Sequence, residues 1–156
     1  MNISKHITYE EATRSDTARR RGIPNVPDET QAEAMQYVAS MIFEPLRMHM
    51  GEPVRVSSFF RSPLLNKGIA GSSNTSQHMK GEAMDICRFA DSQFRNSDLF
   101  SYILQNLDFD QLIWEHGTEK EPDWVHVSLK RMHNRKQVMR TYKQNGITRY
   151  KTMNCE

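Results

Sequence analysis

Apolar and polar residues alternate over residues 124–129, the pattern of a half-buried β-strand. Three aliphatic residues of this run are expected to face a core: Val125, Val127 and Leu129. His126 then faces the opposite side, toward a cleft. Residues 110–115 form a second β-prone run, and turn-forming residues lie between the two, so the pattern predicts an antiparallel hairpin with a long loop.

A third strand is expected over residues 82–87, where Gly81 permits a tight turn into the strand. In this strand Ala83 and Asp85 share one face, while Met84 and Ile86 lie on the other. Asp85 is therefore expected to face the same cleft as a histidine of the neighbouring strand. Residues 54–58 look like a further strand, and a glycine- and serine-rich loop is expected over residues 64–75.

Helical spacing dominates the first third of the chain. Thr8 and Ser15 are expected to begin two short helices, and Asp28, with Gln31 three residues later, to cap a long amphipathic one. Pro45 should kink this helix and Gly51 should end it. Another helix is expected to run to Leu107, capped by one of two adjacent residues, Asn96 or Ser97.

These elements predict an α+β fold in which a small antiparallel sheet packs against helices. With 156 residues the chain is most simply one domain, large enough for a core without disulfide or metal staples. We expect a single domain over residues 1–156, with a helical N-terminal brace at about 6–50 and a basic C-terminal end at about 130–156.

The net charge of +2 hides an asymmetry, because residues 124–155 include no acidic residue. Basic residues recur through that segment: Lys130, Arg131, Arg135, Lys136, Arg140, Lys143, Arg149 and Lys151. Such an end can attract a polyanion such as teichoic acid, lipid headgroups or nucleic acid, or can simply balance an acidic patch elsewhere. No motif for specific nucleic-acid recognition accompanies it.

The two cysteines, Cys87 and Cys155, form no disulfide framework, and Cys87 is expected to pack in the core. No apolar stretch reaches the length of a membrane span, and the first residues lead into no signal-peptide core. We therefore expect a product that is cytoplasmic when synthesised.

The most informative stretch is Ser76–Asp85, which sets a histidine and an aspartate seven residues apart around a glycine. With His126 from the predicted hairpin, His78 and Asp85 make two imidazoles and one carboxylate. Three protein ligands with an open fourth position are typical of catalytic rather than structural zinc. The spacing therefore predicts a catalytic zinc site.

Several ordered motifs resemble the zinc D-Ala-D-Ala carboxypeptidase family, whose fold recurs in the hedgehog signalling domain. The motifs are Ser58-Phe59-Phe60-Arg61-Ser62-Pro63, Ser76-x-His78-x-x-Gly81-x-Ala83-x-Asp85, Asp110-Gln111-Leu112-Ile113-x-Glu115 and Asp123-Trp124-Val125-His126-Val127-Ser128. The resemblance spans roughly residues 6 to 130 and is closest to compact members encoded by phages and prophages. It implies a hedgehog/DD-peptidase-like fold with a zinc cleft.

The resemblance also implies roles for individual residues. His78, Asp85 and His126 match the zinc ligands, and Glu115 matches the general base that takes a proton from the attacking water. Arg61 resembles the residue that receives the substrate's charge; its fork suits a terminal carboxylate. Two further residues are expected to hydrogen-bond to substrate or to a ligand: Ser76 and Gln77. Some members carry a second histidine where this chain has Trp124, which shifts proton transfer onto the glutamate.

We therefore expect a zinc peptidase that hydrolyses peptidoglycan stem peptides, either as a carboxypeptidase or as an endolysin-type endopeptidase. Without a signal peptide, such an enzyme is expected to be released at host lysis or carried in a virion. Two alternatives remain open: a zinc-stabilised binding module without hydrolytic activity, and a virion structural or wall-docking protein that uses the basic C-terminal end.

Overall fold

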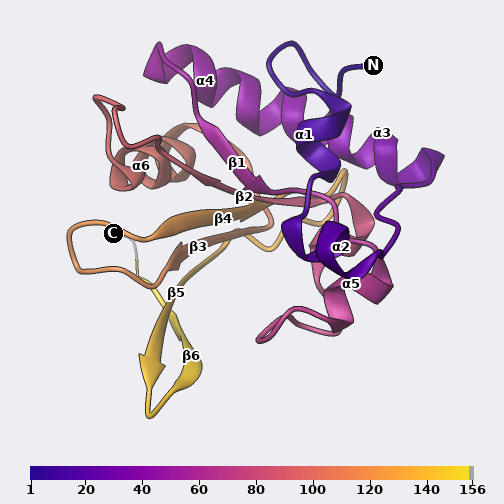
Figure 1. The fold of residues 1–156 in the computed structure, drawn as a ribbon. Coiled ribbons are helices and arrows are strands. Elements are labelled where there is room, and N and C mark those ends of the chain that lie inside the picture. The colour runs from indigo at the N-terminus through magenta and orange to yellow at the C-terminus, as the bar shows by residue number, and fades with distance from the viewer. Residues whose placement is uncertain (155–156) are drawn as a thin grey trace.

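A computed structural model describes residues 1–154 as an α+β fold built on one six-stranded sheet, with strand order β1-β2-β4-β3-β5-β6 (Figure 1). Neighbouring strands are antiparallel except for β3 and β5, which are parallel. The strands are β1 (Arg55–Ser58), β2 (Ala83–Cys87), β3 (Gln111–Glu115), β4 (Trp124–Ser128), β5 (Gln137–Gln144) and β6 (Ile147–Thr152). The sheet is thus larger than expected and only mostly antiparallel.

The helices gather around the part of the sheet formed by β1, β2 and β4, away from the β5–β6 hairpin (Figure 1). They are α1 (Tyr9–Thr13), α2 (Asp16–Arg21), α3 (Glu29–Val38), a π-helical segment η1 (Ala39–Phe43), α4 (Glu44–Met50), α5 (Pro63–Lys67), the 3₁₀ segment η2 (Gln77–Lys80) and α6 (Asn96–Asn106). Thr8, Ser15 and Asp28 cap the first three as predicted. No helix of residues 1–154 is long and apolar enough to cross a membrane.

The predicted irregularity near Pro45 takes the form of a π-helical turn. Pro45 has no N–H to donate back along the helix. The helix widens into the π-helical turn η1, which ends two residues before Pro45. There the Glu44 N–H bonds to the Ala39 carbonyl, and the helix then continues as α4. Gly51 ends the helix in a left-handed conformation, as expected.

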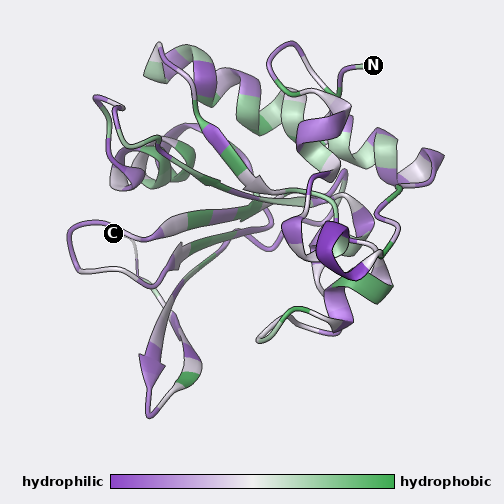
Figure 2. Cartoon of the chain, viewed as in Figure 1, coloured by the Kyte–Doolittle hydropathy of each residue, from purple (hydrophilic) through white to green (hydrophobic). Residues whose placement is uncertain are grey.

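Side-chain alternation divides the sheet into a core face and a cleft face, as predicted for β2 and β4. Met84, Ile86, Val125 and Val127 have no exposed surface and pack in the hydrophobic core. The colouring of Figure 2 shows this as hydrophobic residues concentrated on the central strands and on the helix faces turned to them. Asp85 and His126, which alternate with these residues, lie on the other face.

Two local predictions were wrong. Residues 64–75 are not entirely loop, because α5 begins at Pro63, whose fixed φ suits a first helical turn, with the Ser62 hydroxyl accepting from the Leu65 N–H. The cap of α6 is Arg95 rather than Asn96 or Ser97. Its N–H donates to the Asp98 carboxylate. The Asn96 amide group instead donates to the Pro122 and Asp123 carbonyls.

The C-terminal end forms strands β5 and β6, a hairpin for which no element was predicted. The hairpin turns at Asn145 and Gly146, both with positive φ. In Figure 1 it projects beyond the rest of the sheet.

An ion pair on a buried carboxylate anchors the start of this hairpin. Asp110, immediately before β3, has no exposed surface and accepts bonds from the Arg135 guanidinium, the shortest at 2.6 Å, and from the Arg135 N–H. Lys130 adds a second cation at 3.4 Å. Burial alone would raise the pKa of Asp110, but the Arg135 hydrogen bonds and charge outweigh it and lower the pKa to about 2. These basic residues therefore serve the fold and do not form a free cationic surface.

Because the pKa of Asp110 is lower in the folded protein, this ion pair should add to the free energy of unfolding at pH values above the carboxyl's pKa in the unfolded chain. That contribution should disappear as the pH falls toward 2. We expect an Asp110→Asn variant to be less stable than the parent protein by about 2 kcal/mol at pH 7, with the difference shrinking below pH 4. Urea unfolding at a series of pH values measures this. A constant difference across the series would show that shape, not charge, explains the effect.

Candidate metal centre and cleft

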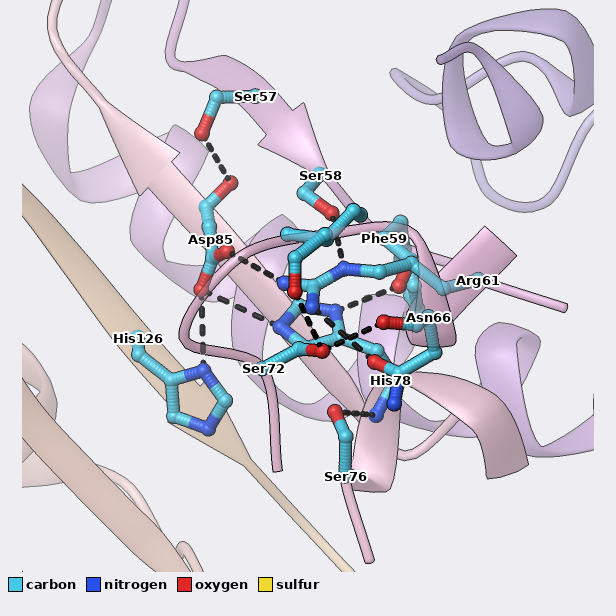
Figure 3. A network of polar contacts seen from close by, with 11 residues as sticks. Ser57, Ser58, Phe59, Arg61, Asn66, Ser72, Ser76, His78, Asp85 and His126 are labelled. Atoms are coloured by element: carbon cyan, nitrogen blue, oxygen red, sulfur yellow. Dashed lines mark hydrogen bonds and ion pairs between the residues drawn. The ribbon is translucent and has the colours of Figure 1, made fainter. Parts of the chain in front are cut away.

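Three side chains from separate segments converge on the cleft face of the sheet. His78, Asp85 and His126 each offer a ligand atom, and these atoms all lie within 4.8 Å of one another. Asp85 and His126 are register partners on β2 and β4, so their side chains lie side by side. Figure 3 shows both histidines turned toward the Asp85 carboxylate. The structure therefore brings together the three residues that the sequence predicted as ligands.

His78 reaches this position because η2 is held tightly against helix α3. The Ser76 hydroxyl caps η2 by accepting from the His78 N–H, and Gly81 ends it with a φ of 72°. A Cβ at Gly81 would collide with the Gln31 carbonyl and the Met35 side chain of α3. Glycine at this position therefore allows both the turn and the close packing that place His78.

The tautomer of His78 leaves a lone pair directed at Asp85. Its Nδ1 lies 2.7 Å from the Phe59 carbonyl, which can only accept, so Nδ1 carries the proton. Burial lowers the pKa of His78, which favours the neutral ring. Nε2 is buried and has no hydrogen-bond partner among residues 1–154, yet it lies 3.3 Å from Asp85 Oδ1. Two acceptors face each other there, an arrangement that a cation between them would satisfy.

The Asp85 carboxylate is itself surrounded by positive and hydrogen-donating groups. Oδ1 lies 3.0 Å from His126 Nδ1, and Oδ2 accepts from Arg61 at 3.3 Å. Burial would raise the pKa of Asp85, but the neighbouring His78 and His126 rings, the latter through a hydrogen bond, lower it. The carboxylate is therefore ionised. Two imidazoles and one ionised carboxylate are the donor set of catalytic zinc, so the residues present fit this metal.

Arg61 is occupied by protein groups rather than directed freely into the cleft. Its guanidinium group donates to the Ser58 hydroxyl, the Asn66 amide oxygen and Asp85 (Figure 3). The side chain is 13% exposed. It borders the cleft, so a substrate role for Arg61 remains a prediction, but the contacts in the structure are those of a residue that orients a metal-ligating carboxylate.

Glu115 ends β3 on the same face as the three converging side chains. His126 pairs with Ile113, and Glu115 follows two residues later, about 7 Å along the strand. One carboxylate oxygen accepts from the Thr141 hydroxyl at 2.6 Å. Burial raises the pKa of Glu115, and the Thr141 hydrogen bond opposes that shift. A carboxylate with a raised pKa beside a metal site is suited to accept and release protons near neutral pH.

The surrounding cleft has a volume of about 1470 Å³. One wall is the loop 69–76 with η2, and the other is the hairpin β5–β6, which contributes Met139, Lys143 and Tyr150. His116 and Trp124 also line it, whereas Trp114 packs edge-on against Phe100 in the core.

Ser76 and Gln77, predicted to bind substrate, both line the cleft but also serve local structure. Ser76 caps η2, and the Gln77 amide donates to Glu82 at 3.3 Å. Two contributors to the site were missed. The Phe59 carbonyl sets the tautomer of His78, and Thr141 binds the proposed base. Neither follows from sequence spacing, since one is a backbone atom and the other lies 26 residues from its partner.

The family of the chain is shown by comparison with known proteins. A family model described as peptidase M15 matches residues 5–128, which include all three converging residues and Glu115. The chain belongs to the peptidase M15 family, the zinc D-Ala-D-Ala carboxypeptidase family that its motifs resemble. No curated protein matches the chain. Members of this family are zinc-dependent peptidases, in agreement with the donor set described above.

We predict that Arg61→Ala weakens zinc binding about 10- to 100-fold without unfolding the protein, because Asp85 loses the partner of its second oxygen. Competition with a zinc-binding dye measures the affinity. Arg55→Ala, which removes an exposed arginine of neighbouring β1, is the matched control and should leave the affinity unchanged. Unaltered affinity in Arg61→Ala would assign Arg61 to substrate alone.

Proposed function

We propose that the protein is a zinc metallopeptidase that hydrolyses peptidoglycan stem peptides. The observation that carries this proposal is the convergence of His78, Asp85 and His126 beside Glu115, in one open cleft of an M15 peptidase. When bound, zinc supplies Lewis-acid polarisation and a water that is a good nucleophile at neutral pH.

The chain's own residues supply the remaining parts of hydrolysis. His78 and His126 hold the metal as neutral imidazoles, and Asp85 adds the single negative charge. Glu115 accepts a proton from the attacking water and returns it to the leaving amine, a role that its half-buried position and raised pKa favour. Two activities are candidates: D-Ala-D-Ala-type carboxypeptidase and endolysin-type endopeptidase. We further propose that the protein is of phage or prophage type.

A zinc-stabilised module without activity is the competing hypothesis. The position of Glu115 argues against this hypothesis, because a protein that only bound the cell wall would not require a partly buried carboxylate at the edge of the metal site. Burial of such a group without a function costs stability.

Glu115→Gln is expected to keep zinc and fold while losing 10²- to 10⁴-fold in turnover, since the amide preserves shape but accepts no proton. Mass spectrometry of purified muropeptides after incubation identifies the bond cleaved and separates exo- from endopeptidase action. Glu33→Gln, at an exposed site on α3, is the control.

Removal of zinc with a chelator should abolish cleavage, and its addition should restore it. Chelator-resistant cleavage would contradict the zinc mechanism, and near-normal turnover by Glu115→Gln would remove the proposed base. An absence of cleavage of any stem peptide by zinc-loaded parent protein would favour the inactive module.

We also propose that the outer side of the hairpin binds an anionic cell-wall polymer. Arg149 and Lys151 are exposed, alternate with the cleft-lining Thr148 and Tyr150 and form no ion pair within residues 1–154. Four other basic residues of this end pair with acids: Lys130 and Arg135 with Asp110, Lys136 with Asp108 and Arg140 with Glu119. Arg131 packs over the Tyr37 ring, and Lys143 donates to the Thr148 hydroxyl. The binding surface is therefore narrower than the whole basic end.

Replacing Arg149 and Lys151 by serine is expected to reduce sedimentation with purified cell walls at low salt, with the difference fading as salt screens the charges. Turnover of a small soluble peptide should be unchanged. Replacement of Lys5 and Arg20, two exposed basic residues of the N-terminal region, provides a control of equal charge. Equal loss in both double variants would indicate nonspecific attraction.

A further inference from the structure

The hairpin β5–β6 lies outside the part of the chain that the family model matches, which ends at residue 128. It nevertheless extends the sheet that carries the candidate metal centre. Strand β5 pairs with β3 in parallel, and Glu115 is the register partner of Thr141. The hairpin therefore meets the site at its proposed general base.

Thr141 is fully buried although its neighbours on β5 are mostly exposed or half-buried. Its hydroxyl donates to Glu115 Oε2 at 2.6 Å and accepts from the His116 N–H at 3.1 Å. The accepted bond occupies a lone pair of the hydroxyl, so its one proton is left for the carboxylate. The hydroxyl is thus oriented from one side by backbone and bound on the other to Glu115.

This contact determines where the Glu115 carboxylate lies. A glutamate side chain has three rotatable bonds, and ordering it costs conformational entropy. A short hydrogen bond from a buried and oriented donor holds one oxygen on the hairpin side. The second carboxylate oxygen forms no side-chain hydrogen bond within residues 1–154 and is left available to a proton.

We propose that Thr141 is a positioning residue for the reaction, and that the hairpin β5–β6 completes the active site by holding Glu115 in place. The inference rests on the proposed function only in assigning Glu115 as the base; the contact itself is independent of that assignment. Among residues 1–154 the Thr141 hydroxyl bonds only to the His116 N–H and to Glu115, so its role is to hold the base and not to bind the metal or the substrate.

The test compares Thr141→Val, which keeps the shape but removes the hydroxyl, with Thr141→Ser, which restores it. Thr152→Val makes the same change on β6, where the hydroxyl forms no hydrogen bond within residues 1–154, and serves as the control. With a defined muropeptide we expect kcat of Thr141→Val to fall roughly ten- to a hundredfold with KM nearly unchanged, because the base and not the substrate site is disturbed.

Thr141→Ser should recover most of the lost kcat, and Thr152→Val should match the parent. Zinc content, measured in all variants, should not change. A serine variant as impaired as the valine variant, or a loss confined to KM, would overturn the proposal.

A crystal structure of zinc-loaded Thr141→Val separates this inference from the activity itself. We expect the Glu115 carboxylate to leave its position in Thr141→Val and to keep it in Thr141→Ser, whether or not the protein cleaves a peptide. An unmoved carboxylate in Thr141→Val would overturn the positioning role. If the carboxylate moves in Thr141→Val but the parent protein cleaves no peptide, the positioning contact is supported and only the proposed function is refuted.

Discussion

The buried carboxylate of Asp85 is the constraint on which this site depends. An ionised group with only 8% of its surface exposed is costly unless charges and hydrogen bonds surround it. Arg61, from the segment that follows β1, and His126, from β4, supply these groups, and His78 approaches the same carboxylate from η2. Placing Asp85 in the middle of a sheet therefore draws three separate segments toward one point.

The balance around this carboxylate is incomplete without a cation. Arg61 binds one oxygen and His126 lies beside the other. That second oxygen also faces His78 Nε2, which carries no proton because the ring is protonated at Nδ1, toward the Phe59 carbonyl. Such a pair of acceptors would be a defect in a purely structural network. In a member of a zinc-dependent family, such acceptors are the atoms that a metal ion would hold together.

The C-terminal hairpin shows how a segment beyond the family match can become part of the same site. The ion pair of Arg135 with the buried Asp110 fixes where β5 begins, and parallel pairing with β3 then sets which residue lies beside Glu115. Because side chains alternate along a strand, a shift of one residue would turn the Thr141 hydroxyl away. The register of the hairpin, and with it the environment of Glu115, therefore depends on an ion pair at its base.

The sequence by itself determined the local elements and the chemistry of the site. Alternation predicted β2 and β4 with the correct faces, capping residues predicted the N-terminal helices, and the spacing of His78, Asp85 and His126 with their flanking motifs indicated a zinc peptidase of the family now shown. These features depend on neighbours in the chain, which a sequence displays directly. The turn at Asn145 and Gly146 was equally local, and a hairpin there could have been predicted.

Only the tertiary structure decided which distant groups meet. It paired β5 with β3, buried Thr141 against Glu115, directed the Phe59 carbonyl to His78 and committed Arg61 to the Asp85 carboxylate. It also decided which residues of the basic end pair with acids, among them Arg135 and Arg140, and which form no ion pair, among them Arg149 and Lys151. The physical reason is that these contacts depend on strand order and register over tens of residues. Packing and the pairing of buried charge set that register, and no periodicity in the sequence records it.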